Sequence, residues 1–367
     1  MESRRIAIVG LGLIGGSLAF RLKSRGHYVT GFDVDPERAN TALHLGAIDG
    51  VGLSLLDGVK DVDVVFVATP VGIVSEIVAD IAPHVGQETI ITDVGSVKRP
   101  IMENVSRMDL PVTFVGGHPM AGREQGGIAA ADPNLFENAV YVLTPPIEPK
   151  GPWPEALAVL KRVIQGDLGA NVTVMDAVTH DEVVAAVSHM PHVAAAAIVN
   201  ALGQTAEKIP KALALAAGGF RDTTRIASGS PELWADICLH NSASVLRSVA
   251  YLQDQLEGFQ EALLTRDAQG LEEFFGKARD LRAEVPAAQR GLIPSIYEVM
   301  VPVPDTPGAI SAVTSLLASA ALSLKDISIV RQREGEVGAL RLGLADGASR
   351  DLALEILLSE GYRAYGR

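Results

Sequence analysis

The sequence predicts an α/β Rossmann-type dinucleotide-binding domain, then an all-α dimerisation domain, then a small ferredoxin-like βαββαβ module. Strand-like and helix-like runs alternate along residues 1–175, which is typical of a sheet covered by helices on both faces. An alanine-rich helical pattern occupies residues 176–285. Strand patterns return over residues 296–367, after prolines and a glycine in residues 286–295 break the pattern and mark a linker.

The composition narrows the choice of partners and compartment. The net charge is −13, with 31 basic against 44 acidic residues, which disfavours nucleic acid and anionic membranes as partners. The single cysteine, Cys238, excludes an internal disulfide and fits a reducing cytosol. No signal segment opens the chain, and apolar runs such as residues 193–199 are too short to span a bilayer. We therefore expect a cytoplasmic protein.

The first βαβ unit carries a dinucleotide fingerprint. A strand over residues 5–9 leads into Gly10-Leu11-Gly12-Leu13-Ile14-Gly15, then a helix over residues 16–25 and a strand over residues 28–32. The glycines permit a tight turn and close passage of a pyrophosphate, and the helix N-terminus attracts its charge. Asp33, which closes the second strand, accepts ribose hydroxyls and repels a 2′-phosphate, so NAD is favoured over NADP. Arg38 lies close enough to leave NADP use open, and a glycine turn without a nucleotide is the alternative.

Further strands are expected over residues 62–68, 89–92, 113–115, 140–143 and 171–174. In such sheets ligands bind at the carboxyl ends of strands, where the sequence places Thr69-Pro70, Asp93 to Lys98 and Gly117-His118-Pro119. Ser96 is either part of this crevice or the N-cap of the next helix. The residues that we expect to contact the cofactor are Gly10, Gly12, Leu13, Ile14, Gly15, Asp33, Thr69, Pro70 and Asp93.

His118 stands among glycines in the stretch Val115 to Gly122, which we expect to be an open loop after a strand. A histidine in such a loop exchanges a proton near neutral pH. The alternative is a ring that only hydrogen-bonds backbone. The fingerprint before it and the basic cluster after it favour a catalytic role.

A second histidine cluster lies in the helical region. Ser188-His189-Met190-Pro191-His192 puts His189 and His192 three residues apart, on one face of a helix that Pro191 is expected to kink. The cluster predicts a wall of a polar pocket; hydrogen-bonded core histidines or a metal site are the alternatives. Because no acidic or cysteine ligand stands at helical spacing from the pair, we expect no metal.

Arg225 is the expected carboxylate-binding residue of this region. Its neighbours Thr224, Ile226 and Ala227 predict a partly buried guanidinium, whose planar fork suits a carboxylate. Asp222, three residues earlier, can pair with it, and a solvated surface pair is the alternative. The long apolar helices here also predict a homodimer interface, from which Trp234 can reach a neighbouring pocket.

The C-terminal module is expected to contain six elements. They are a strand over residues 297–303, a helix over 309–319, strands over 323–331 and 338–344, a helix over 350–359 and a last short strand.

Five motifs together resemble the prephenate dehydrogenase family, and they are Gly10–Gly15, Asp93–Lys98, Gly116–Gly122, Ser188–His192 and Phe220–Ala227. The C-terminal module resembles an ACT domain through the turn Asp305-Thr306-Pro307-Gly308. This resemblance implies NAD-dependent oxidative decarboxylation of prephenate to 4-hydroxyphenylpyruvate, a step toward tyrosine. It further implies tyrosine as an effector near Asp305, Pro307 and Gly308.

The resemblance also implies roles for single residues. His118 accepts the proton of the ring hydroxyl, Ser96 orients this histidine, and Arg225 binds a substrate carboxylate. The other residues that it places around the substrate are Ser188, His189, His192, Asp222, Glu124 and Trp234, with the acids pairing around the arginine and the tryptophan coming from the partner subunit.

Two rival functions remain, an arogenate dehydrogenase and a sensor that binds NAD and an amino acid without turnover.

Overall fold

The computed structural model describes residues 3–123, 125–148, 152–285, 297–304, 306–330 and 338–366. The chain divides into two compact units, Met1–Pro286 and Ala287–Arg367, and each is described by itself. The expected linker, residues 286–295, lies outside the described residues.

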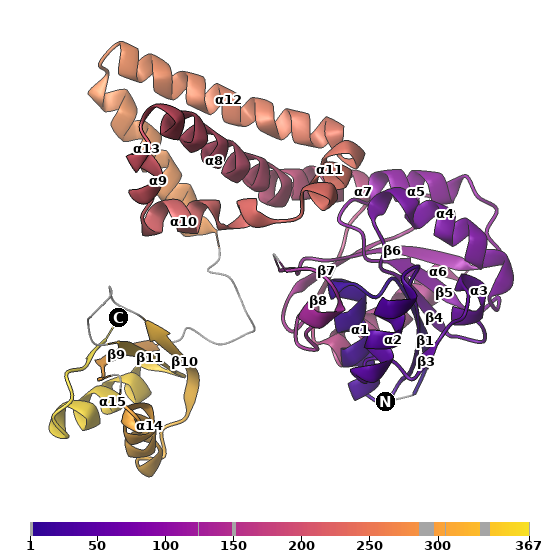
Figure 1. Ribbon diagram of the computed structural model, residues 1–367, viewed down its shortest axis with the longest axis horizontal. Coiled ribbons are helices and arrows are strands. Elements are labelled where there is room, and N and C mark those ends of the chain that lie inside the picture. The colour runs from indigo at the N-terminus through magenta and orange to yellow at the C-terminus, as the bar shows by residue number, and fades with distance from the viewer. Residues whose placement is uncertain are drawn as a thin grey trace. The chain divides into compact units, whose positions relative to one another are not determined.

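The first unit is built on one eight-stranded sheet (Figure 1). Its strands are β1 Arg5–Val9, β2 Tyr28–Phe32, β3 Gly50–Val51, β4 Val64–Val67, β5 Ile90–Asp93, β6 Thr113–Pro119, β7 Val140–Thr144 and β8 Asn171–Val174. The spatial order is β3-β2-β1-β4-β5-β6-β7-β8, and the neighbours from β3 to β6 are parallel. This is the strand order of a Rossmann-type fold, which confirms the prediction. β7 departs from it, because it is antiparallel to β6, and β8 is parallel to β7.

Helices cover both faces of the sheet because its buried strands are apolar on both sides. In β1, Ile6 and Ile8 face one apolar cluster, whereas Ala7 and Val9 face the other. The first cluster is closed by α1 Leu13–Ser24, α2 Pro36–His44, α6 Trp153–Arg162 and the π-helix η3 Val163–Leu168. The second is closed by α3 Leu55–Gly58, α4 Val71–Ile81, the 3-10 turn η1 Ala82–His84 and α5 Arg99–Ser106. A further 3-10 turn, η2 Ile128–Ala130, packs on the first face.

A helix that runs without a break from Ala177 to Lys208 opens the helical part of this unit. It comprises α7 Ala177–Val184, the π-helix η4 Ala185–His189 and α8 Met190–Lys208. The π-turn ends two residues before Pro191, whose ring and missing N–H disturb the hydrogen bonds of the turn before it. The remaining elements are α9 Lys211–Ala214, α10 Gly218–Thr224, η5 Arg225–Ser228, α11 Pro231–His240, α12 Ser242–Leu264 and α13 Ala268–Glu284.

The length of this helix corrects one expectation. We expected apolar runs too short to span a bilayer, but the 32-residue helix passes that test by length and composition, with 22% of its apolar window buried. Its start is buried against the sheet domain, where His180 and His189 are almost inaccessible to solvent. The exposed apolar stretch beyond these histidines is therefore not explained by burial in the core of a single chain.

Two aspartates of the helical part cap helices of the sheet. The backbone N–H groups of Lys98 and Arg99 donate to the carboxylate of Asp181 at 2.7 and 2.9 Å, at the start of α5. The N–H of Val71, at the start of α4, donates to Asp236 at 3.0 Å. Because each carboxylate satisfies amides that a helix leaves open, the two parts are joined by directional bonds as well as by apolar contact.

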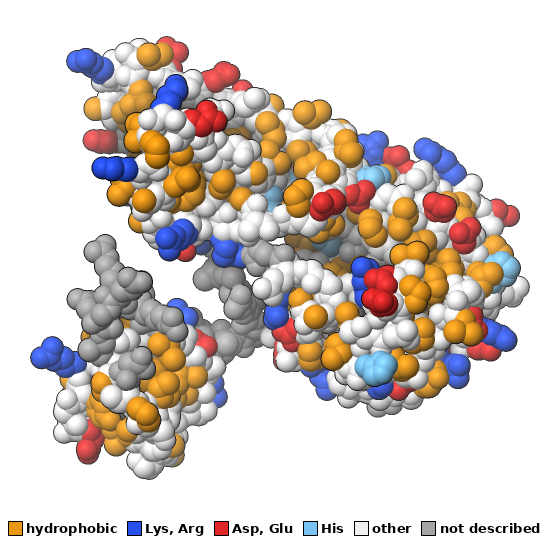
Figure 2. All heavy atoms as spheres, in the orientation of Figure 1, with side chains coloured by type: hydrophobic (Ala, Val, Ile, Leu, Met, Phe, Trp, Pro, Cys, Tyr) orange, Lys and Arg blue, Asp and Glu red, His pale blue; other side chains and the backbone are white. Residues whose placement is uncertain are grey.

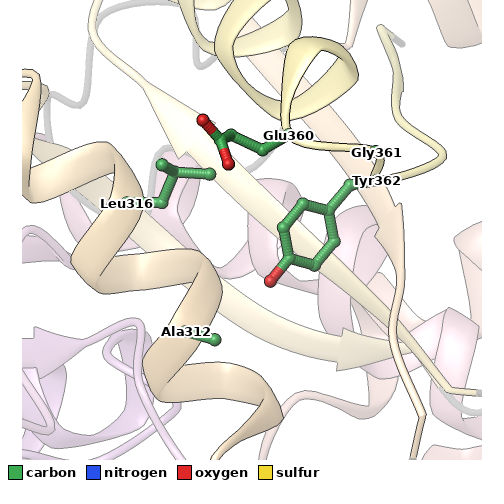
Figure 3. Close-up of a pocket in the computed structure, with 5 residues that line it drawn as sticks. All are labelled: Ala312, Leu316, Glu360, Gly361 and Tyr362. Atoms are coloured by element: carbon green, nitrogen blue, oxygen red, sulfur yellow. The ribbon is translucent and has the colours of Figure 1, made fainter.

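The second unit has a βαββαβ order, as predicted. Its elements are β9 Tyr297–Pro302, α14 Ala309–Ser319, β10 Leu324–Val330, β11 Ala339–Leu344, α15 Gly347–Ser359 and β12 Tyr365–Gly366. The sheet order is β10-β11-β9-β12, antiparallel throughout, and apolar residues on one face of β9 and β11 pack on both helices. A hollow of about 330 Å³ lies beside α14. It is lined by Ala312, Leu316, Glu360, Gly361 and Tyr362 (Figure 3).

Candidate active site

The glycine turn after β1 has the shape that a dinucleotide requires. Gly10 has φ +94°, and a Cβ there would collide with the backbone carbonyl of Ala68, just after β4. A Cβ at Gly15 would collide with the carbonyl of Gly10. At Gly12, by contrast, a Cβ would meet nothing within 4 Å. The open space above Gly12 lies at the N-terminus of α1, where a pyrophosphate is bound in such folds. Leu13 and Ile14, the first residues of this helix, are half-buried.

Asp33 closes β2 as expected and is nearly buried. Its Oδ2 accepts the N–H of Leu11 at 2.8 Å, and its Oδ1 lies 3.3 Å from Arg38 Nη1. Arg38 also lies 3.8 Å from Asp35. Two carboxylates thus neutralise this arginine, which makes it a poor partner for a 2′-phosphate and supports the preference for NAD.

The carboxyl end of β4 also fits a bound cofactor. The hydroxyl of Thr69 is buried and has no hydrogen-bond partner in the part of the chain that the structure describes. A buried hydroxyl without a partner costs free energy that a ligand can recover. Pro70 is exposed beside it and is the N-cap residue of α4. The turn, Asp33 and Thr69 together fit NAD.

Asp93 has a structural position, which corrects our expectation that it contacts the cofactor. The residue is fully buried, and its carboxylate accepts the N–H groups of Gly95 at 2.8 Å and Gly117 at 3.0 Å. Its third partner is the ammonium of Lys98, which is also fully buried. Burial lowers the pKa of Lys98, while Asp93 opposes that shift. Asp93 therefore holds β6 against β5.

His118 lies in strand β6 and is 8% exposed, not in an open loop as expected. The first half of β6 pairs with β5, and the second half continues beyond it and pairs with β7, where His118 is opposite Val142. The glycines before it serve close packing, since a Cβ at Gly117 would lie 2.5 Å from the Asp93 carbonyl oxygen. The ring is thereby fixed just past the carboxyl end of β5.

A second histidine and an aspartate extend behind His118. Its Nδ1 lies 2.8 Å from Nε2 of His180, and His180 Nδ1 lies 2.7 Å from Oδ1 of Asp181. All three side chains are buried. The pKa of His118 is held well below 6.5, mainly by burial and then by the nearby His180, Lys98 and His189. His118 is therefore a neutral imidazole at neutral pH.

The histidines of the expected pocket wall lie together. His189 is buried, its Nδ1 lies 3.3 Å from the amide nitrogen of Asn241, and its Nε2 has no partner among the described residues. Because the amide nitrogen donates, Nδ1 accepts and the proton of the neutral ring sits on Nε2. Burial lowers the pKa of His189 to about 4, so the ring is an uncharged donor. His192 and Ser188 are half-buried beside it.

Trp234 packs within its own chain, whereas we expected it to reach the site of a partner subunit. Its ring stacks on His192 with centroids 3.7 Å apart, and it meets His189 edge-on at 6.1 Å. Gly229 permits this, since a Cβ there would lie 2.8 Å from the indole nitrogen. Trp234 thus contributes to the wall formed by the histidines of its own chain.

The expected carboxylate-binding region is exposed. Arg225, at the start of η5, and Asp222, in α10, are both exposed, which corrects the prediction of a partly buried arginine. Glu124 lies outside the described residues. Ser96 is half-buried in the turn after β5; Lys98 takes the N-cap position of α5, so Ser96 does not cap that helix.

Sequence reasoning missed Lys98, His180, Asp181 and Asn241. Lys98 stands in a motif that we singled out, and a lysine five residues after a strand-ending aspartate was the available signal. His180 and Asp181 lie at the start of a predicted helix, where polar residues are common. Only the tertiary fold brings them to His118, because β6 and α7 are 62 residues apart at this contact.

The fold and the site together define a class of enzyme. A Rossmann domain that fits NAD, a buried neutral histidine at the end of its sheet and a polar helical wall define an NAD-dependent oxidoreductase. Two family profiles match the chain: "Prephenate dehydrogenase, nucleotide-binding domain" over residues 17–175 and "Prephenate dehydrogenase, dimerization domain" over residues 176–277.

Known proteins agree with these profiles. The chain is 39% identical to the prephenate dehydrogenase of Bacillus subtilis over 95% of this chain and 94% of the relative. It is 33% identical to that of Lactococcus lactis over 96% and 97%. A crystal structure of Aquifex aeolicus prephenate dehydrogenase with hydroxyphenyl propionate and NAD⁺ is similar at TM-score 0.70 and 30% identity, covering 78% of this chain and 99% of that one. Synechocystis arogenate dehydrogenase is similar at TM-score 0.65 and 32% identity, covering 77% and 100%. The chain belongs to the prephenate dehydrogenase family.

Gly117→Ala tests whether close packing of β6 on Asp93 positions His118. The added methyl group forces the strand away from the Asp93 carbonyl, so we expect a loss of about 1–3 kcal/mol of unfolding free energy and a large loss of turnover. Gly122→Ala is the matched control, because Gly122 is exposed and a Cβ there meets nothing within 4 Å. Urea unfolding and NADH formation measure both effects. Equal behaviour of the two variants would contradict this account of the strand.

Proposed function

We propose that this protein oxidatively decarboxylates prephenate to 4-hydroxyphenylpyruvate with His118 as the general base. The observation that carries the proposal is the buried, neutral His118 at the carboxyl end of the sheet, beside a turn that fits NAD. A neutral imidazole can accept a proton, and positioned general bases typically accelerate such steps by about 100 to 10,000-fold.

The chemistry requires one proton acceptor and a place for two carboxylates. When bound, NAD supplies the hydride acceptor. His118 takes the hydroxyl proton of the ring carbon that loses hydride, so the oxygen becomes a carbonyl as the C–H electrons leave. The bond to the ring carboxylate then breaks and carbon dioxide departs. The electron pair passes through the ring to the carbonyl oxygen, which regains a proton as His118 returns to its neutral form, so the ring ends as a phenol. Burial around His118 keeps water from competing for this proton.

The helical wall supplies the substrate contacts in this proposal. Arg225 binds a carboxylate through its guanidinium, with Asp222 and Glu124 ordering it. The Nε2–H of His189, which has no partner in the described part of the chain, donates to an acceptor oxygen of the substrate. Ser188, His192 and Trp234 complete the wall, and Ser96 orients the substrate near His118. The cofactor contacts are the glycine turn, Asp33, Thr69 and Pro70.

A homodimer accounts for the exposed apolar face of the helical part. Large apolar side chains stand exposed along α8, α12 and α13, and these are Ile198, Val199, Leu246, Tyr251, Leu256, Leu263, Leu264, Phe275 and Leu281. Figure 2 shows apolar side chains spread over these helices. A face of this kind on an acidic protein suits a second copy of the chain better than a lipid surface.

Light scattering tests the homodimer. The measured mass should be twice that of one chain, and a monomer would exclude the dimer.

The C-terminal unit is the proposed ACT domain, with tyrosine as its effector. The βαββαβ order supports this, as does the turn before α14, where Gly308 has φ +91°. Pro307 belongs to this turn, and Asp305 lies outside the described residues. Pro307 and Gly308 are not among the residues that line the hollow of Figure 3.

The reaction is tested by NADH formation from NAD with prephenate, beside an identical assay with arogenate. We expect turnover of prephenate, because the profiles and the Bacillus subtilis relative carry that name. Turnover of arogenate alone would keep the mechanism and change the substrate. Turnover of neither would favour the sensor.

His118→Asn and Arg225→Ala should affect different kinetic constants, kcat in the first variant and KM in the second. Loss of the base should lower kcat at least about 100-fold with little change in KM, whereas loss of the guanidinium should mainly raise KM. His44→Asn, on an exposed face of α2, is the control. Near-normal kcat in His118→Asn would refute the assignment of the base.

The lowered pKa of His118 predicts the pH profile. The base must be neutral, and a pKa below 6.5 keeps it neutral as the pH falls to that value. We therefore expect kcat/KM for prephenate to stay level from pH 8 to 6.5 and to fall only below it. A fall in kcat/KM with its midpoint at or above pH 6.5 would contradict the buried environment of this ring.

Calorimetric titration of the full chain with tyrosine tests the effector. We expect saturable heat, and Gly308→Val should abolish it because a β-branched residue strains at φ +91°. Gly258→Val, in open space on α12, controls for a general effect of the substitution. Absence of heat with the unsubstituted protein would remove tyrosine as the ligand.

A further inference from the structure

The hydrogen bonds behind His118 determine which of its ring nitrogens carries the proton. The Asp181 carboxylate accepts the N–H groups of Lys98 and Arg99 at the start of α5, and both bonds favour its ionised form. An ionised carboxylate only accepts, so the Nδ1 of His180, 2.7 Å away, must donate to it.

The direction of the hydrogen bond between His180 and His118 follows from the proton on His180 Nδ1. When the His180 ring carries a single proton, that proton is on Nδ1, and its Nε2 is bare and only accepts. The Nδ1 of His118, 2.8 Å away, must then be the donor. With its one proton on Nδ1, the neutral His118 ring has a bare Nε2, and no partner for that atom is found in the described part of the chain.

We propose that His180 and Asp181 are positioning residues that fix the tautomer of His118 with a bare Nε2 toward the substrate. This inference rests on the proposed role of His118 as the base. Neither residue contacts the reacting atoms. They act through His118, as the aspartate of a hydrolase triad acts through its histidine.

The same arrangement supports the ring after it accepts a proton. The new proton occupies Nε2, and the Nδ1–H of the imidazolium keeps its bond to His180. The negative charge of Asp181 lies one ring behind, in a buried setting where it is weakly screened. The proton stays on His118, so the arrangement needs no transfer along the chain of bonds.

A purely structural role for His180 is the competing explanation. Its ring is fully buried, and buried polar groups are hydrogen-bonded in any fold. The two explanations differ in what they predict for the proton on His118. Packing alone does not select a tautomer, whereas the proposed role does.

The first experiment uses the full-length protein without substitutions. The protein is labelled with ¹⁵N-histidine, and the resonances of His118 are assigned from their absence in His118→Asn. We expect ¹⁵N shifts of a neutral ring with a protonated Nδ1 and a bare Nε2 at pH 7.5. A protonated Nε2 would overturn the proposal whatever the activity of the enzyme, so this result is independent of whether His118 is the base.

The second experiment compares His180→Leu with His180→Gln. Leucine removes the acceptor, so kcat should fall about 10 to 100-fold with KM for prephenate unchanged, and the proton should move to Nε2. Glutamine keeps an acceptor for His118 and a donor for Asp181, so it should recover most of kcat and restore the Nδ1 proton.

His27→Gln is the matched control. His27 is also buried, with its Nε2 3.1 Å from Asp167, but it lies at the start of β2 away from the site. We expect it to change the melting temperature and leave kcat and the His118 shifts unchanged. A folded His180→Leu protein with kcat within twofold of the original, or with the proton still on Nδ1, would overturn the proposal.

Discussion

The carboxylate of Asp181 is the interaction on which the arrangement of the site depends. It accepts two backbone N–H groups from the start of α5 and the ring N–H of His180. The first two bonds join the helical part to the sheet. The third holds His180, which in turn is bonded to the proposed base, His118. Because one buried side chain does both, the position of the helical wall and the orientation of His118 cannot vary independently.

The buried pair of Lys98 and Asp93 supports this arrangement from the other side. Burying two charges costs several kcal/mol, and the pair is tolerated because backbone amides complete the bonding of the carboxylate. In return, Asp93 holds the glycine-containing half of β6. Lys98 also places a positive charge near His118, which disfavours the protonated ring. The pair of Lys98 and Asp93 therefore contributes both to the fixed position of β6 and to the neutral state of His118.

The sequence predicted those features that are local. The strands over residues 28–32 and 171–174 and the helix over residues 309–319 have the predicted bounds, because periodicity and glycine turns define them. The open loop at His118 was wrong because its strand is completed by β7, through pairing that no local pattern reveals. The partly buried Arg225 was wrong for a related reason. Its apolar neighbours lie on a short helix at the surface of one chain.

The charges of the site explain how so acidic a chain can use a neutral base on an anionic substrate. The net charge of −13 repels prephenate at a distance, so attraction must come from local groups. Burial lowers the pKa values of His118, His189 and His192, so these rings supply hydrogen bonds and no charge at neutral pH. A cationic histidine cluster would bind the substrate more tightly, but it would contain no proton acceptor. In the proposed function, carboxylate binding at the exposed Arg225 is separate from proton acceptance at the buried His118, so both can operate at the same pH.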